Sequence, residues 1–271
     1  AAVTNASPPA CNNAAAQLTD DYSYVIGSVD FDDPNGHIAL QSSYQWLAND
    51  VPISNGQVLE LLLLHLDNSV DGSAGESPLQ AVDVDYTAGK WGSALMLGPD
   101  GKLRFQRQGN LALDEGTIEM WIAARADGDD PIYASHSHYL FYYHAPNGDY
   151  TMIAQSGNSG VIYAGGTVNG QWQSAYSNRA TTRTWLAGQW HHIVYTFSVS
   201  NNFMRFYLDG VLMAESNEGH YWMPSLAAND FYIGARHWAD AAHYLIDEVR
   251  ILGRVATAEQ IAAWARRSDQ S

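Results

Sequence analysis

From residue 57 onwards the chain is a succession of short apolar segments, each followed by residues that favour turns. Apolar or aromatic runs occupy residues 58–66, 117–123 and 190–197, among others. Turn formers separate them, as in PNGD at 146–149 and DG at 209–210. Many short strands with turn signals at short intervals are typical of a sandwich or barrel. The spacing therefore predicts an all-β fold.

A helix is expected only near the C-terminus. Thr257 stands where an N-cap is expected, and Gln260 follows three residues later, which is the spacing of a capping box. Ile261 and Trp264 lie three residues apart, so they share one face of the helix and can pack on the sandwich.

Charge and cysteine content limit the possible partners. The chain has 13 basic and 29 acidic residues, a net charge of −16, which argues against nucleic acid or an anionic membrane as a partner. No stretch approaches the roughly 20 apolar residues that a membrane span needs. Cys11 is the single cysteine, so an internal disulfide is impossible. We expect a secreted or cell-surface protein without membrane insertion.

The N-terminal part differs from the rest. Residues 1–20 are rich in Ala, Asn, Ser and Pro and are predicted to be a flexible leader. Residues 21–56 form an N-terminal extension, which either adds strands to the sandwich or ends a neighbouring domain. The carboxylates of Asp30, Asp32 and Asp33 suit either a calcium loop or an acidic turn facing water.

Six blocks in the remaining chain occur in a characteristic order, and together they resemble a bacterial laminin-G-like domain of the concanavalin A-like lectin/glucanase superfamily. The blocks are GKWGSAL at 89–95, GTIEMWI at 116–122, WHHI at 190–193, FYLDGV at 206–211, IG at 233–234 and IDEVRI at 246–251. The resemblance covers residues 57–267. It implies a two-sheet antiparallel jelly-roll sandwich closed by a short C-terminal helix.

The resemblance also implies a structural calcium ion. In this family calcium often ties the loop after the first strand to the last strand, and the matching positions are Asp67 and Asp247. Calcium takes six to eight oxygen ligands, several of them backbone carbonyls, which agrees with so few carboxylates. The alternative is that Asp67 caps a turn and Asp247 pairs with an arginine such as Arg250.

Glycosidase chemistry is poorly supported. It needs two carboxylates that project from one face of the site. Asp247 and Glu248 are consecutive, so strand alternation predicts that they point to opposite faces. Glu119 belongs to a family strand block, where it is more often structural.

A polysaccharide lyase is the better enzymatic alternative, because lyases on this fold use Tyr or His as base and acid. The segment 138–144 is rich in both, and His138, Leu140, Tyr142 and His144 are expected to share one face. The lyase candidates are His138, Tyr142, His144 and His192.

Carbohydrate binding fits the sequence better. Sugar rings stack their CH faces on aromatic rings, while polar side chains take the hydroxyls. The candidate ligand-binding residues fall outside the family blocks; they are Trp172, Tyr176, Tyr221, Trp222, Arg236, His237 and Trp238. We therefore predict a secreted, calcium-stabilised carbohydrate-binding module for a polysaccharide or glycan. The alternatives are a lyase and a structural or adhesive module of a larger surface protein.

Overall fold

The computed structural model describes residues 60–176, 181–217, 230–236 and 241–267, together with the backbone of short strands between residues 11 and 53. The chain divides into two compact units, Ala1–Gln57 and Val58–Ser271. Asp32 and Asp33, part of the expected acidic turn, lie outside the described residues. The described residues of the first unit form antiparallel strand pairs, which are β1 (Cys11–Asn12) with β4 (Asp30–Phe31), β2 (Gln17–Leu18) with β3 (Val25–Ile26), and β5 (Trp46–Ala48) with β6 (Val51–Ile53).

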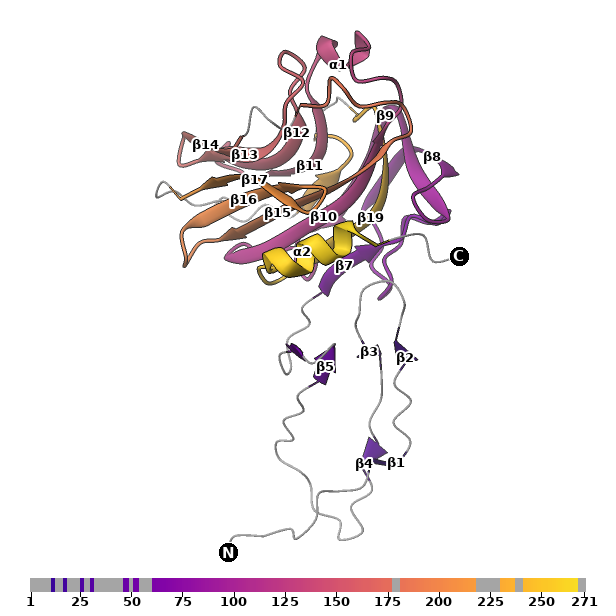
Figure 1. Ribbon diagram of the computed structural model, residues 1–271, viewed down its shortest axis with the longest axis vertical. Coiled ribbons are helices and arrows are strands. Elements are labelled where there is room, and N and C mark those ends of the chain that lie inside the picture. The colour runs from indigo at the N-terminus through magenta and orange to yellow at the C-terminus, as the bar shows by residue number, and fades with distance from the viewer. Residues whose placement is uncertain are drawn as a thin grey trace, which may run out of the picture. The chain divides into compact units, whose positions relative to one another are not determined.

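The second unit has two layers of antiparallel strands that share β9 (Ser93–Gln106) (Figure 1). One layer has the order β14 (Gln171–Ala175), β13 (Ile162–Val168), β12 (Tyr150–Gln155), β11 (His138–His144), β18 (Asp230–Ile233) and β9. The other has β9, β19 (Tyr244–Leu252), β10 (Glu115–Ala124), β15 (Trp190–Ser198), β16 (Phe203–Leu208) and β17 (Val211–Ser216). In addition, β7 (Glu60–Leu64) pairs with β19, and β8 (Gln80–Ala88) pairs with β9. The predicted all-β, two-sheet antiparallel sandwich is confirmed.

The strand β9 joins the two layers because its two ends pair with different partners. Near its start, Leu95 and Met96 pair with β19. Near its end, residues 103–106 pair with β18. The structure has one strand of 14 residues here, although the segment GPDG at 98–101 in its middle consists of residues that favour turns.

One apolar core lies between the layers, and it is built from alternate residues of the strands. Ile118, Met120 and Ile122 of β10 face Phe141 and Tyr143 of β11 in the same cluster. All five side chains are inaccessible to solvent. This burial removes a large apolar area from water, which is the main favourable term for such a fold.

The C-terminal helix α2 (Ala258–Ala265) packs on the other side of the second layer, where Ile261 and Trp264 contact Val194 and Tyr207. Its predicted cap is present, because the Thr257 hydroxyl accepts a hydrogen bond from the Gln260 backbone N–H at 3.2 Å and the Gln260 side chain accepts from the Thr257 N–H at 3.1 Å.

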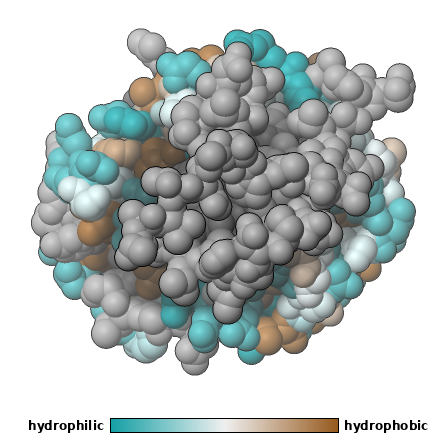
Figure 2. All heavy atoms as spheres, turned by 90° about the horizontal axis from the view of Figure 1, so that it is seen from below, coloured by the Kyte–Doolittle hydropathy of each residue, from teal (hydrophilic) through white to brown (hydrophobic). Residues whose placement is uncertain are grey.

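A second short helix, α1 (Ile132–Ser135), precedes β11 and has no counterpart in the sequence prediction. Figure 2 shows the molecule from below, where the visible described residues around the rim are mixed in hydropathy.

Candidate functional site

The strands β11–β14 are uncharged apart from their histidines. They contain no Asp, Glu, Lys or Arg, although the chain has 29 acidic and 13 basic residues. Each strand buries one set of side chains in the core and presents the other on the opposite side of the sheet. We call this second side the aromatic face. It consists of Tyr139, Tyr142, His144, Tyr150, Met152, Ala154, Tyr163, Gly165, Thr167, Trp172, Ser174 and Tyr176.

Backbone pairing arranges the aromatic face in three rows that cross the strands. The middle row is Tyr142, Met152, Gly165 and Ser174. One flanking row is His144, Tyr150, Thr167 and Trp172. The other contains Tyr139, Ala154 and Tyr163, with Tyr176 beside Tyr163. On β13 and β14 the middle row therefore offers only a glycine and a serine between larger rings.

The rings of the aromatic face form a continuous series of contacts. Tyr163 lies between Trp172 and Tyr176, with ring centroids 6.1 and 5.9 Å away. Trp172 lies 6.3 Å from Tyr150, which stacks in turn on Tyr142 at 5.8 Å. Such edge-to-face and offset arrangements each stabilise by about 0.5–1.5 kcal/mol beyond simple burial, so the rings hold one another in place.

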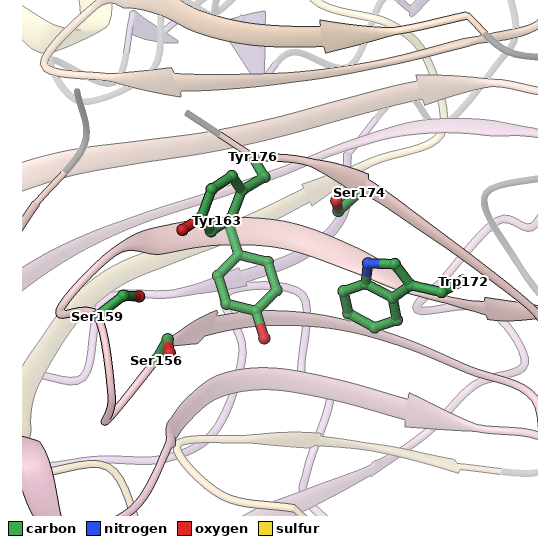
Figure 3. A pocket seen from close by; sticks show the side chains of 6 residues that line it. All are labelled: Ser156, Ser159, Tyr163, Trp172, Ser174 and Tyr176. Atoms are coloured by element: carbon green, nitrogen blue, oxygen red, sulfur yellow. The ribbon is translucent and has the colours of Figure 1, made fainter. Parts of the chain in front are cut away.

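A hollow of about 370 Å³ opens on this face between β13, β14 and the turn that follows β12 (Figure 3). Trp172 and Tyr176 are 48% and 45% exposed there, which is unusual for such large apolar side chains. The lining combines three aromatic rings with the hydroxyl groups of three serines. These residues are Ser156, Ser159, Tyr163, Trp172, Ser174 and Tyr176.

The buried carboxylate of Asp149 fixes the end of this sheet. It accepts hydrogen bonds from the backbone N–H groups of Asn169 (2.8 Å) and Gly170 (3.2 Å), in the turn between β13 and β14. It also accepts one from the Asn147 side chain at 2.7 Å. These hydrogen bonds join the turn at residues 146–149 to the turn between β13 and β14. Burial alone would raise the pKa of Asp149, but these donors outweigh it and hold the pKa below its usual value.

Two of the predicted ligand-binding residues, Trp172 and Tyr176, line the hollow. Arg236 lies at the other side of the aromatic face, where its guanidinium is 5.0 Å from the Tyr139 ring centroid and donates to the Tyr139 hydroxyl at 3.2 Å. The remaining four predictions, Tyr221, Trp222, His237 and Trp238, lie outside the described residues.

Sequence reasoning missed Tyr150, Tyr163 and the three serines of the lining. The alternation of side chains along β12 and β13 could have revealed the two tyrosines, because the residues next to each tyrosine in its strand face inward. The serines carry no such signal, since hydroxyl residues are common at turns and strand ends.

The four lyase candidates do not come together. Tyr142 and His144 both belong to the aromatic face, with ring centroids 6.1 Å apart. Tyr142 is only 3% exposed, and burial raises its pKa, which opposes a role as base. The other two candidates, His138 and His192, do not belong to the aromatic face.

A β-bulge explains why His138 does not face Tyr142. The pairing of β11 with β12 shifts between Tyr139 and Phe141, so strict alternation fails at this point. His138 is fully buried and lies 5.3 Å from the Tyr133 ring, which belongs to the core. Its Nε2 is 3.2 Å from the Ile132 carbonyl oxygen, and its Nδ1 accepts from the His243 N–H at 3.2 Å.

His192 belongs to a buried ion cluster on the side of the second layer that α2 covers. Its Nε2 is 2.8 Å from Glu119 Oε1, and the Arg250 Nε donates to Glu119 Oε2 at 2.7 Å. The Arg250 guanidinium also lies 3.9 Å from the Trp264 ring of α2. Burial would raise the pKa of Glu119, but Arg250 and His192 outweigh this and lower it. The cluster is therefore structural, as the sequence analysis expected of Glu119.

Asp247 and Glu248 lie on the same side of β19. Between Asp247 and Arg250, β19 has one residue more than the facing part of β10, which makes a β-bulge. Glu248 in this bulge has a φ of 51°. The flanking residues Ile246 and Val249 both belong to the core. The two carboxylates thus both point away from it, and the alternation expected from sequence fails because of the bulge.

The two candidate calcium ligands approach the same loop, residues 89–93, from different parts of the chain. Asp247 Oδ2 accepts hydrogen bonds from the N–H groups of Lys90 (2.8 Å) and Trp91 (3.2 Å). Asp67 Oδ1 accepts one from the Ser93 N–H at 2.6 Å. Asp247 is fully buried, and burial raises its pKa to about 8, so its ionised form needs stabilisation by neighbouring groups.

The donor set is compatible with a calcium ion. An ionised carboxylate offers about four lone-pair sites. Asp247 accepts hydrogen bonds from the N–H groups of Lys90, Trp91 and, at 2.9 Å, Glu248, which leaves room for a single metal–oxygen contact, and Asp67 has more capacity. Within the described residues no group of three His, Cys, Asp or Glu side chains could hold a metal. Main-chain carbonyls would therefore supply most of the ligands.

None of the described helices is long and apolar enough to cross a membrane. No curated protein sequence matches the chain significantly. The structure resembles domain 4 of AbnA, a GH43 extracellular arabinanase from Geobacillus stearothermophilus, in complex with arabinotriose. The TM-score is 0.62 at 18% identity, over 76% of this chain and 98% of that domain.

Two structures of botulinum neurotoxin serotype D are also similar. Its binding domain gives a TM-score of 0.60 at 12% identity, over 76% of this chain and 51% of that one. Its ligand binding domain in complex with N-acetylneuraminic acid gives 0.60 at 13% identity, over 76% and 50%. The chain thus spans about half the length of these toxin domains, and at such identities the likeness concerns the fold. Residues 97–262, more than half of the chain, match the family described as the concanavalin A-like lectin/glucanases superfamily, with a laminin-G-type sequence pattern, and the chain belongs to this family.

Proposed function

We propose that this chain is a carbohydrate-binding, lectin-like module whose ligand occupies the hollow beside Tyr163, Trp172 and Tyr176. The observation that carries the proposal is the hollow itself, which is lined by three aromatic rings and three serine hydroxyls beside strands that contain no Asp, Glu, Lys or Arg. Sugars need this combination, since their CH faces stack on rings and their hydroxyls need polar partners.

The comparisons add support of a general kind. Two of the similar structures are complexes with carbohydrates, arabinotriose in one and N-acetylneuraminic acid in the other. Secretion or display at the cell surface suits a module that meets polysaccharide outside the cell. We infer the ligand of this chain from the residues of its own aromatic face.

Calcium is part of the proposal as a structural ion. It would lie between Asp67, Asp247 and the loop 89–93, because each of the two carboxylates accepts a hydrogen bond from that loop. A bound divalent cation would stabilise the buried carboxylate of Asp247 and tie the start of the sandwich to its last strand. Binding only to the folded state raises stability by mass action.

The proposal is tested by retention of the intact protein on polysaccharides. In affinity electrophoresis through gels that contain arabinan, xylan, mannan or pectin, we expect at least one polymer to slow the migration of the protein. The chain length of that polymer should stay unchanged. Absorbance in the ultraviolet would report the unsaturated products of a lyase. Migration unaffected by every polymer, with calcium present, contradicts carbohydrate binding, and growing absorbance would favour the lyase.

A further inference from the structure

The charge of the aromatic face restricts the ligand beyond the class of carbohydrates. Between residues 138 and 176 the only acidic residue is Asp149, which is buried and bonded to two turns, and there is no Lys or Arg. The six residues that line the hollow carry no ionisable group except tyrosine hydroxyls. Burial raises the pKa of Tyr163, so its hydroxyl is neutral at physiological pH.

The guanidinium groups near the hollow that the structure describes are engaged with the protein itself. Arg183 lies next to the hollow but donates to the carbonyl oxygens of Ser159 (3.2 Å) and Asn158 (2.9 Å). Arg104 pairs with Asp230 at 3.0 Å. Arg236 lies on the Tyr139 ring at the β11 side of the face. The described residues that line the hollow include no Lys or Arg, so a sugar carboxylate would find no cation among them, and the net charge of −16 would repel a polyanion from a distance.

The exposed rings also lie too far apart for one sugar. Trp172 and Tyr176 are four residues apart on or just after β14, so their Cα atoms are separated by about 13 Å at the usual rise of a strand. Between them the middle row has only Ser174 on β14 and Gly165 on β13. Tyr150 extends the series beyond Trp172 towards β11. The face thus offers a row of stacking positions that is longer than one sugar ring, in which Tyr163 contacts both Trp172 and Tyr176.

We propose that the ligand is an uncharged glycan bound through several consecutive sugar units, with one unit stacked at Tyr163 and Tyr176 and another at Trp172 and Tyr150. This inference rests on the proposed function and names the substrate class for the same site. Neutral stacking and hydrogen bonds carry the affinity, so charge contributes little to it.

A matched pair of polymers tests the charge. Polygalacturonate and its fully methyl-esterified form have the same backbone and differ in the carboxylate, and arabinan or xylan extends the comparison to other neutral chains. We expect retention by neutral polymers only, with an affinity that changes less than about twofold between roughly 50 and 500 mM NaCl, because screening affects only charged contacts. Retention by the acid polymer alone, weakened by salt, overturns the inference while carbohydrate binding stands. Failure of every polymer to bind contradicts the proposed function instead.

Chain length tests the number of units. In calorimetric titrations with the monosaccharide and with oligomers of the retained neutral polymer, we expect affinity to rise about tenfold or more from the monomer to the longer oligomers as the second stacking position fills. Trp172→Ala and Tyr176→Ala should each weaken binding of the long oligomers. An affinity that is the same for the monomer as for longer oligomers shows that one sugar suffices and overturns the multi-unit site.

Discussion

The ring of Tyr163 meets that of Trp172 edge-on, with centroids 6.1 Å apart and planes at 65°, although the two residues belong to different strands. Strand pairing places them on one side of the sheet, where Tyr176 completes the group. The consequence is a rigid aromatic surface at the β13–β14 edge, available to a ligand without rearrangement.

Removing either exposed ring should weaken binding without unfolding the protein. For Trp172→Ala and Tyr176→Ala we expect roughly tenfold lower affinity for a retained glycan, since each ring contributes on the order of 1 kcal/mol by stacking. Isothermal titration measures the loss. Tyr86→Ala on β8 is the matched control, and an equal loss in this variant would place the ligand elsewhere.

The turn between β13 and β14 should depend on Asp149. Asp149→Ala removes the acceptor of two backbone N–H groups, so we expect a loss of about 2 kcal/mol in unfolding free energy. Because the pKa of Asp149 is lowered in the folded state, its contribution is present above about pH 4, the ordinary value for Asp, and is lost as the pH falls below it. Urea unfolding at pH 7 and pH 3 measures both effects. Asp129→Ala, at an exposed position, should change neither.

The buried ion cluster should be far more sensitive than an exposed ion pair. Glu119→Gln removes the charge of the buried carboxylate that pairs with the Arg250 guanidinium, so we expect destabilisation of about 3–5 kcal/mol. Glu215→Gln breaks the partly exposed pair with Arg205, and its cost should stay below about 1 kcal/mol. Chemical unfolding compares the two. Similar losses would show that the cluster contributes no more than a surface pair.

Stability should decline in mild acid because of His138. Burial lowers its pKa to about 4, while the unfolded chain has about 6.5, so the folded state binds this proton more weakly. Its contribution is complete above pH 6.5 and decreases by up to about 3 kcal/mol as the pH falls to 4. In His138→Gln the difference in unfolding free energy from the wild type should therefore shrink from pH 7.5 to pH 4.5. A difference in unfolding free energy that stays constant over this pH range would contradict the assignment of the effect to His138.

The proposed calcium ion should be visible in thermal melting. We expect a chelator to lower the melting temperature of the wild type and added calcium to restore it. Asp247→Asn and Asp67→Asn should melt lower and show no further shift with chelator, whereas Asp129→Asn should behave like the wild type. A wild-type curve unchanged by chelator would exclude the ion.

Several parts of this arrangement are predictable from local sequence. The apolar runs of β10, β15 and β19 and the capping box of α2 follow from residue patterns within a few positions. Trp172 and Tyr176 are recognisable as ligand candidates because they stand outside the family blocks. The expected shared face of His138 and Tyr142 fails at a bulge, which no residue pattern announces.

The sequence by itself determines the strands, the cap of the last helix and the absence of acidic and basic side chains from β11–β14, because propensity, alternation and composition are local properties. Only the tertiary structure decides that β9 belongs to both layers, that Asp247 and Glu248 share a side, and that Tyr163 meets Trp172. These outcomes depend on register and bulges, which are fixed by hydrogen bonds between strands and by packing across the core. The family resemblance predicted the two-layer architecture, whereas the pairing of the strands brings the residues of the candidate site together.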